Sequence, residues 1–517
     1  MKKVILFFLI IISVKCFAQV PEDAIRYSWF PQNGTARIMA IGGAMGSLGG
    51  DITAAYVNPA GLGFYKTNEA VLTPGFFSNN NKANFRQAET LDKRNGFSFG
   101  PSGVIFGFHS PFSGEKNNAI CLAINQTANF NNTIHYKSLN NYSSFGEQFA
   151  EELAKSNDPI ATFLYTNSKA PYSVAPAWNS YLIDTVRVNG VLQVRAAAER
   201  ILDSGQALQQ ELIKRTSGGI YEFALSFAEN SNKKWLWGAT IGIPVVYYKS
   251  NITFIETDTS SNTFNGFKSL IYNDNFKTTG VGGNLKLGVI YRPGDYIRLG
   301  LAIHTPSFFL LKDTRTVDMY TQVETDSGNT YSFAEHSTTY TNDQPGEASY
   351  YQTTPWKVIL SASYVFREIQ DTKKQRAFIT ADIEYLNHRG SRFSNNNEDP
   401  TDQETAYNKA LNKVVKQDFK GTFNFRVGGE IKFNTIMGRL GFAYYGNPYK
   451  DKALKGNRTL LSGGLGYRNK GFFIDLTYIY NITKDINIPY RLEDRANTFA
   501  TIKQEQANVV ATVGFKF

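Results

Sequence analysis

The links between strand-like segments constrain the fold of this chain more than any other feature. From residue 68 onward, apolar and polar side chains alternate with a period of two, which is typical of β-strands with two different faces. Phe423 and Phe425, for example, share one face of a segment whose other face carries Arg426. Alternation alone also fits a soluble β-sandwich, so the links must decide between the two folds.

Long and short links alternate along the chain. Short turns such as Asn434-Thr435 follow the even-numbered segments, whereas links such as 79–95, 131–215 and 306–354 follow the odd-numbered ones. A sandwich has no reason to put its long loops at one end, but an outer-membrane barrel has short periplasmic turns and long outer loops. The sequence therefore predicts a 14-stranded antiparallel transmembrane β-barrel over residues 68–517. Its segments are 68–78, 96–110, 117–130, 216–229, 234–249, 277–292, 295–305, 355–366, 375–388, 420–433, 437–446, 458–468, 471–482 and 506–517.

The two ends of the chain indicate an exported membrane protein. Lys2 and Lys3 precede an apolar run, residues 4–14, and a small-residue cleavage site ends at Ala18, so residues 1–18 are predicted to be a secretory signal peptide. The last segment alternates and ends on Phe517, an aromatic end that favours recognition by the barrel-assembly machinery. We therefore expect a protein of the bacterial outer membrane, in contact with its lipid.

One link is too long to be a bare connection. In residues 131–215, Glu147 to Lys155 and Ala196 to Leu212 have helical patterns, and in the second of these Leu208 and Leu212 lie four residues apart. This link is predicted to be an extracellular loop with helices that forms a small cap over the outer mouth.

Motifs for other chemistry are missing from the sequence. The five histidines form no helical pair suited to zinc, and Cys121 is the only cysteine after the signal peptide, so we expect no metal site, no cofactor and no intrachain disulfide. His109 and Ser110 are adjacent and would point to opposite faces of a strand, which disfavours a hydrolase. The net charge of +10 is spread along the chain rather than gathered in a basic patch, which disfavours nucleic acid as a partner.

A Gly/Ala-rich stretch precedes the first strand and does not alternate. It runs from Ala36 to Phe64 and contains the tetrapeptide Asn58-Pro59-Ala60-Gly61. Its low charge lowers the cost of packing it inside a barrel, and Pro59 removes a backbone donor, so the stretch resists pairing as an extra strand. Residues 19–67 are therefore predicted to form a plug, or hatch, inside the lumen. We expect Asn58 to Gly61 toward the periplasmic end. An ordinary Asn-Pro turn in a Gly-rich loop is the simpler alternative.

This stretch resembles the N-terminal segment of the FadL/TodX family of outer-membrane transporters for hydrophobic compounds. The residues that carry the resemblance are Gly42, Gly43, Ala44, Gly49, Asp51, Ala54, Ala55, Tyr56, Asn58, Pro59, Ala60 and Gly61. The resemblance implies a fourteen-stranded barrel plugged by an N-terminal hatch. It also implies passive uptake of long-chain fatty acids or aromatic hydrocarbons. In this family, ligand leaves sideways through a gap made by a kink in the third strand.

Candidate site residues follow from this resemblance. Asn58, Pro59, Ala60 and Gly61 are the candidate hatch or gate residues. Cations on the polar faces of strands are candidates for contact with ligand in the lumen: Lys286, Arg298, Lys357, Arg426 and Arg439. Polar residues interrupt the third segment, and these are the candidates for the kink at a lateral gate: Asn125, Gln126 and Thr127.

An alternative interpretation is a surface receptor or adhesin in which the barrel only anchors the 131–215 loop. A haem receptor is one variant, with His135 or His336 as axial ligands on outer loops. An enzyme is the class that the sequence favours least, and we expect a monomer.

Overall fold

A computed structural model describes residues 23–109, 116–155, 174–188, 190–325, 327–366, 376–397, 399–452 and 454–517. The predicted signal peptide, residues 1–18, lies outside the described residues.

The predicted fold class is confirmed, because fourteen antiparallel strands close into one barrel. Closure comes from β23 (Ala500–Lys516), which pairs with β22 (Phe472–Asn487) on one side and with β1 (Glu69–Leu72) and β2 (Pro74–Phe85) on the other. Several wall strands are interrupted and continue as a second strand. In chain order the other wall strands are β3 (Ala88–Phe99) with β4 (Ser102–His109), β5 (Asn117–Asn129) with β6 (Asn132–Asn140), β9 (Leu208–Asn230), β10 (Trp235–Asp258), β11 (Ser269–Tyr291), β12 (Ile297–His304) with β13 (Phe308–Glu324), β15 (Gly346–Thr353) with β16 (Lys357–Phe366), β17 (Ala377–Asn387), β19 (Gly421–Phe433), β20 (Ile436–Tyr445) and β21 (Arg458–Asn469).

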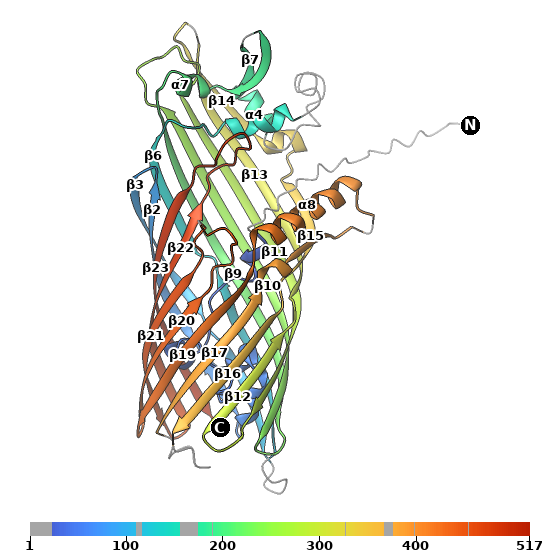
Figure 1. Cartoon of the computed structure of the whole chain (residues 1–517), viewed down its shortest axis with the longest axis vertical. Helices are drawn as coiled ribbons and strands as arrows, with labels where there is room; N and C mark the ends of the chain where they lie inside the picture. Colours follow the sequence, from blue (N-terminus) through green and yellow to red (C-terminus); the bar gives the residue numbers. More distant parts are fainter. Residues whose placement is uncertain are drawn as a thin grey trace, which may run out of the picture.

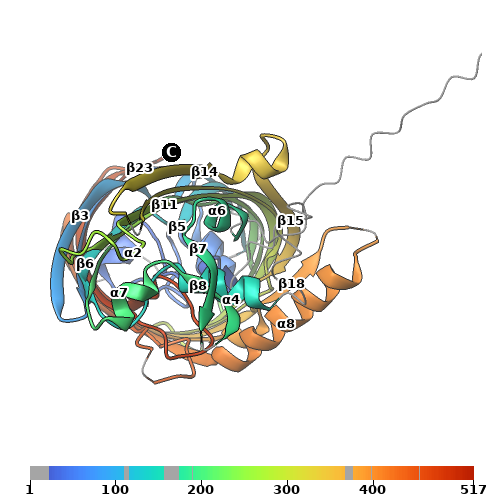
Figure 2. The same ribbon diagram turned by 90° about the horizontal axis from the view of Figure 1, so that it is seen from above.

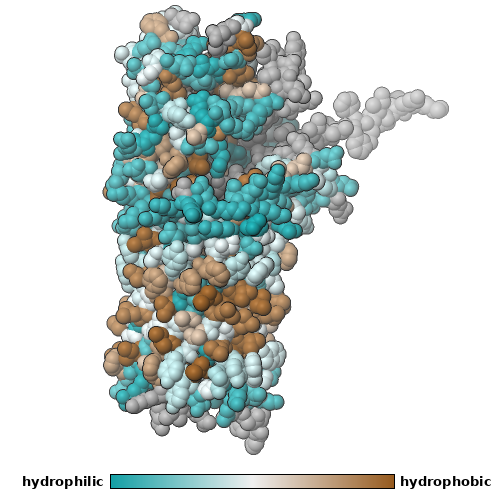
Figure 3. Space-filling model, viewed as in Figure 1, coloured by the Kyte–Doolittle hydropathy of each residue, from teal (hydrophilic) through white to brown (hydrophobic). Residues whose placement is uncertain are grey.

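The wall extends well beyond the thickness of a membrane. β10 has 24 residues and would span roughly 80 Å, whereas the apolar band of such a barrel is about 25 Å tall. The outward residues near its start, such as Trp237 and Ile241, are apolar, and those after Lys249 are mostly polar. On the face drawn in Figure 3 the result is a brown belt across the lower part of the barrel, with a hydrophilic surface above it.

Several links expected to be loops are therefore largely strands. Most of 79–95 is a hairpin of β2 and β3, most of 250–276 belongs to β10 and β11, and 306–354 contains β13, β14 (Thr330–His336) and β15. Above the membrane, both faces of a strand can be polar, since water replaces lipid outside. The apolar alternation that marks a strand in sequence is lost there, although backbone pairing continues.

The N-terminal region lies inside the barrel, near the end with the short turns (Figures 1 and 2). It contains α1 (Asp23–Arg26), α2 (Ala36–Ala40), α3 (Ala54–Val57) and the 3-10 helix η1 (Pro59–Phe64). Every residue from 34 to 63 except Gly50 is buried. A chain segment this short of charge can be enclosed at little desolvation cost.

The outer mouth carries a cap made from the 131–215 link. It contains α4 (Glu147–Ala154), α6 (Val174–Asn179), α7 (Glu199–Asp203) and the two-stranded sheet of β7 (Ile183–Val188) and β8 (Val191–Ala196). The helix expected from Glu147 to Lys155 is present as α4. The helix expected from Ala196 to Leu212 is present only from Glu199 to Asp203, because Ala196 ends β8 and Leu208 and Leu212 belong to β9. A spacing of four residues fits a strand face as well as a helix face, and Gln210 between them is also buried.

Four further elements lie outside the wall order. β18 (Arg392–Asn395) pairs with β15, and η3 (Ser337–Thr341) and η5 (His388–Gly390) are single turns. α8 (Asp402–Asp418) lies on the outside of the barrel, as both ribbon views show. Within the described ranges, we find no helix whose length and apolar character would let it cross a membrane.

Candidate transport path

Wall side chains hold the N-terminal region through its backbone. Asp382 accepts hydrogen bonds from the amides of Met45 (2.9 Å) and Gly46 (3.1 Å), and the Ser361 hydroxyl donates to the same carboxylate (2.6 Å). Thr477 donates to the carbonyl of Ala36 at 2.5 Å. A Gly/Ala segment has few polar side chains of its own, so strands on the wall supply the partners that its buried backbone needs.

The Asn58-Pro59-Ala60-Gly61 tetrapeptide is buried against the lower ends of β10 and β11. The Asn58 side-chain amide donates to the carbonyl of Gly46 (2.6 Å) and that of Val289 (3.2 Å), and its oxygen accepts from the Ala60 amide (3.2 Å). Asn58 thereby caps η1, with Pro59 at the first position, where a missing donor costs nothing. The tetrapeptide thus joins two parts of the plug to the wall, near the short-turn end.

Wall glycines that the sequence reading did not single out make this close approach possible. A Cβ on Gly288 would overlap the Asn58 side-chain oxygen, and one on Gly238 would meet the Pro59 carbonyl carbon at 2.6 Å. Gly283, on the same strand as Gly288, has open space at that position. The sequence did contain a signal for these contacts. A glycine within an alternating strand often marks a place where another backbone segment approaches closely.

The five candidate lumen cations all have partners. Lys286 donates to the Glu222 carboxylate, Arg298 donates to the Leu48 carbonyl (2.6 Å), and Lys357 is 3.9 Å from Glu384. The two remaining guanidinium groups lie in buried ion pairs: Arg426 with Glu384 (3.2 Å) and Asp382 (3.7 Å), and Arg439 with Glu430 (2.6 Å) and Asp475 (2.5 Å). The Lys357 ammonium lies farther from its nearest partner than the charged groups of the other four cations do from theirs. Lys357 is therefore the cation with the most freedom to contact a ligand.

A polar cavity of about 100 Å³ lies between residues 27–33 and the wall. Lys286, Lys357 and Arg426 line it, whereas Arg298 and Arg439 do not. The structure thus brings three of the five cations together and leaves two elsewhere.

The third wall strand is irregular at the residues proposed for a kink. β5 pairs with β4 only as far as Ile124, and its register with β9 shifts between Gln126 and Ala128, so Thr127 is a bulge residue. Within the described residues, β3 pairs with β2, and β6 pairs with β9, so no ladder joins β3 to β6. Asn125 and Thr127 line the polar cavity, which therefore reaches this seam.

Asn33 of the plug fills the seam, and the sequence reading missed it. Its side-chain amide lies 3.0 Å from the Phe99 carbonyl, 3.1 Å from the Asn125 side-chain oxygen and 2.8 Å from the Gln126 carbonyl. The Gln126 side chain accepts from the Phe99 amide at 3.0 Å. The side chains of Asn33 and Gln126 therefore form hydrogen bonds with backbone groups that have no strand partner where the ladder is interrupted.

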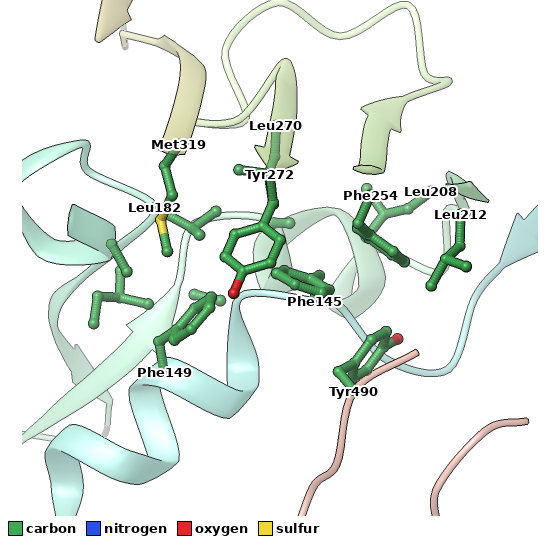
Figure 4. Close-up of a cluster of buried hydrophobic side chains, with 14 of the residues drawn as sticks. Phe145, Phe149, Leu182, Leu208, Leu212, Phe254, Leu270, Tyr272, Met319 and Tyr490 are labelled. Carbon is green, nitrogen blue, oxygen red and sulfur yellow. The ribbon is translucent and has the colours of Figure 1, made fainter. Parts of the chain in front are cut away.

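Aromatic rings pack together where the cap meets the upper ends of wall strands (Figure 4). Phe145 stacks on Phe254 of β10 with centroids 4.2 Å apart, and it also contacts Tyr272 of β11 (4.9 Å) and Tyr490 (5.6 Å). Glu147 follows in α4, where burial raises its pKa to about 7 despite a hydrogen bond from the Ser144 amide. The cap is a small apolar core in its own right.

Residues considered for other functions are engaged elsewhere. His135 lies 2.9 Å from Glu211, and His336 lies 2.8 Å from Asp318. Within the described part of the chain, no group of three or more histidine, cysteine, aspartate or glutamate side chains could hold a metal ion. At the C-terminus, Phe517 exchanges two backbone hydrogen bonds of 3.1 Å with Asn68.

Solved structures share this architecture. No family model and no curated protein matches the chain. The toluene transporter TodX of P. putida superposes with a TM-score of 0.51 at 13% identity, over 94% of this chain and 99% of that one. A FadL homologue of Pseudomonas aeruginosa gives 0.51 at 14% identity, over 93% and 98%. The chain therefore has the fold of FadL-type outer-membrane proteins.

Proposed function

We propose that this chain, with its FadL-type barrel, is a passive outer-membrane transporter for hydrophobic small molecules, gated by its N-terminal hatch. The observation that carries the proposal is a buried, weakly charged N-terminal region inside the barrel, bordered by a cavity that reaches an unpaired seam in the wall. The structures of similar fold include a toluene transporter and a FadL homologue.

In this proposal, the ligand enters below the cap, occupies the polar cavity and leaves sideways at the seam. Asn33 and the kink residues would have to move apart, since they occupy the seam in the closed state. Asn58, Pro59, Ala60 and Gly61 would act as the gate residues of the hatch.

The substrate class that we propose is long-chain fatty acids or aromatic hydrocarbons. A fatty acid would place its carboxylate in the cavity, where Lys357 is the most available cation. An aromatic hydrocarbon needs no such partner. Comparing uptake by Lys357→Met and by the unaltered protein would separate the two, because only carboxylate uptake should fall.

The remaining parts of the proposal concern biogenesis. Residues 1–18 would direct export and be removed, and the C-terminal strand with Phe517 would be recognised by the barrel-assembly machinery. The barrel would work as a monomer in the outer-membrane lipid, with residues 19–67 as the hatch and 68–517 as the barrel.

The direct test of gating is deletion of residues 36–61. The deletion should produce a barrel with a large, permanently open ion conductance in planar bilayers. Unchanged conductance would mean that the N-terminal region does not close the channel.

Excising the 131–215 loop separates transport from the receptor or adhesin alternative. A receptor should lose partner binding while uptake of radiolabelled fatty acid or toluene is unaffected. For the haem variant, titration with hemin should leave the Soret band unshifted if the chain does not bind haem.

A further inference from the structure

α8 lies on the outer surface of the barrel at the upper edge of its apolar belt. Trp356, Tyr385 and Phe423 form a row of aromatic contacts there, with ring centroids 5.8 Å and 5.0 Å apart. Such aromatic girdles mark the interface between lipid tails and headgroups. α8 ends at Asp418, five residues before Phe423, and Figures 1 and 3 show it in the hydrophilic zone directly above the belt.

The orientation of α8 is fixed by specific contacts. Thr401 and Glu404 form a capping box at its start. Leu411 and Val415 are buried toward the barrel. The Asn412 side chain accepts from the Phe393 amide and donates to the Phe393 carbonyl, both at 2.8 Å, as a neighbouring strand would. The opposite face of the helix is therefore held toward the outside.

Three lysines share that outer face. Lys409, Lys413 and Lys416 recur at intervals of four and three residues, which places them in one row on a helix. All three are exposed, and within the described residues none of them forms an ion pair with a carboxylate. Their row continues at the helix end, where the Lys450 ammonium donates to the Lys416 carbonyl at 3.0 Å.

The lysine row borders a groove of about 540 Å³ between α8 and β18. Besides the three lysines, the groove is lined by Phe393, by the hydroxyls of Ser394 and Thr405, and by three asparagines whose amides donate to groups within the groove wall: Asn395, Asn408 and Asn412. A ligand with several anionic oxygens would meet the three lysine cations and the hydroxyls of Ser394 and Thr405. Since the groove opens at headgroup level, lipid brings such oxygens to it at high local concentration.

We propose that this basic groove binds the phosphate groups of anionic lipid headgroups in the outer leaflet. Lysine clusters beside a membrane surface are attracted to anionic lipid, and a groove with neutral donors adds specific contacts to that attraction. Bound lipid would hold α8 against the wall and fix the height of the barrel in the membrane.

The test is native mass spectrometry of the whole protein in neutral detergent, with lipid A, a glycolipid that carries two phosphates, or phosphatidylcholine added. The unaltered protein should retain lipid A in preference to phosphatidylcholine. The variant K409Q/K413Q/K416Q should bind lipid A at least about tenfold more weakly. The matched control K234Q/K470Q/K484Q removes three lysines elsewhere on the surface and should bind as the unaltered protein does.

Three results would overturn the proposal. Lipid A could be retained no better than phosphatidylcholine, the triple variant could bind lipid A unchanged, or inorganic phosphate could displace lipid A completely. The last result would indicate a site for a soluble anion. A melting temperature equal to that of the unaltered protein establishes that the triple variant is folded. If it does not fold, Lys413→Glu provides the same comparison with one charge reversal.

Discussion

The two ends of the lumen are closed by different chemistry. At the short-turn end, backbone amides and carbonyls of the plug form hydrogen bonds with polar side chains of the wall, such as those of Asp382 and Thr477. At the outer end, the cap packs Phe145 among aromatic rings from separate strands. Releasing the plug would break these polar contacts and would also expose buried apolar side chains such as Ile38 and Leu48, whereas lifting the cap would expose an aromatic cluster. The two closures therefore depend on different contacts, so each can be weakened by substitutions that leave the other in place.

Asp382→Ala should have the largest effect, because it removes the acceptor of two plug amides and a partner of buried Arg426. Breaking a buried ionic contact costs about 3–5 kcal/mol, so both thermal stability and closure should suffer. Melting in detergent and bilayer conductance would measure the two effects. Glu493→Ala is the control, since its pair with Lys155 is exposed and should contribute less than about 1 kcal/mol. Equal melting temperatures for the two variants would contradict the role given to Asp382.

Phe145→Ala should loosen the cap and leave the plug in place. Losing a buried aromatic ring costs about 3 kcal/mol, at the low end of the usual range because the cap can partly collapse into the space. Hydrogen exchange should accelerate in α4 but not in residues 36–61. Phe264→Ala removes an exposed ring and is the control. Faster exchange in the plug would show that the two closures are coupled rather than independent.

The wall glycines provide a smaller perturbation of the plug alone. Gly288→Ala places a methyl group against Asn58 and should destabilise the plug by about 2 kcal/mol, whereas Gly283→Ala on the same strand meets open space. Ion leak through planar bilayers should rise for the first variant only. Equal leak from both would mean that the contact between Asn58 and β11 does not contribute to closure.

The smallest effect concerns the pH dependence of the cap. Because the pKa of Glu147 is raised from 4.5 to about 7, the folded cap prefers the protonated carboxyl. The stability from this group is fully present below pH 4.5 and is lost as the pH rises through about 7. Exchange in α4 should therefore be faster at high pH, beyond the intrinsic pH effect on exchange. Glu147→Gln should abolish that excess, and an excess that persists in this variant would assign the pH dependence to another group.

The sequence predicted the membrane-spanning part of the fold better than the part in water. Lipid forces apolar residues onto one face of each strand, so segments such as 422–433 could be recognised from alternation. Above the belt this constraint disappears, and the β2–β3 hairpin looked like a loop. A similar ambiguity affected the expected helix, because the spacing of Leu208 and Leu212 fits both the helix period of 3.6 and the strand period of two.

The candidate site was predictable where residue chemistry is distinctive. Asn58 to Gly61 were proposed because they belong to a segment that resembles a known transporter family, and Thr127 because polar residues interrupt a strand there, where the structure has a bulge. Asn33 could not be identified, since a single asparagine gives no signal until the seam beside it is known. The sequence likewise could not show which cations line the same cavity. That depends on the register between neighbouring strands, which the sequence alone does not give.

The most direct test of the account is to tie the plug to the wall. The hydroxyls of Ser47 in the plug and Ser361 in β16 are 2.8 Å apart, so the double variant Ser47→Cys, Ser361→Cys offers a reversible disulfide. Cys121 is buried and should not interfere, and Ser47→Cys alone is the control. With the disulfide verified by mass spectrometry, uptake of labelled fatty acid or toluene should stop in the oxidised double variant and return on reduction. Uptake that continues at the same rate with the disulfide closed would contradict a mobile hatch.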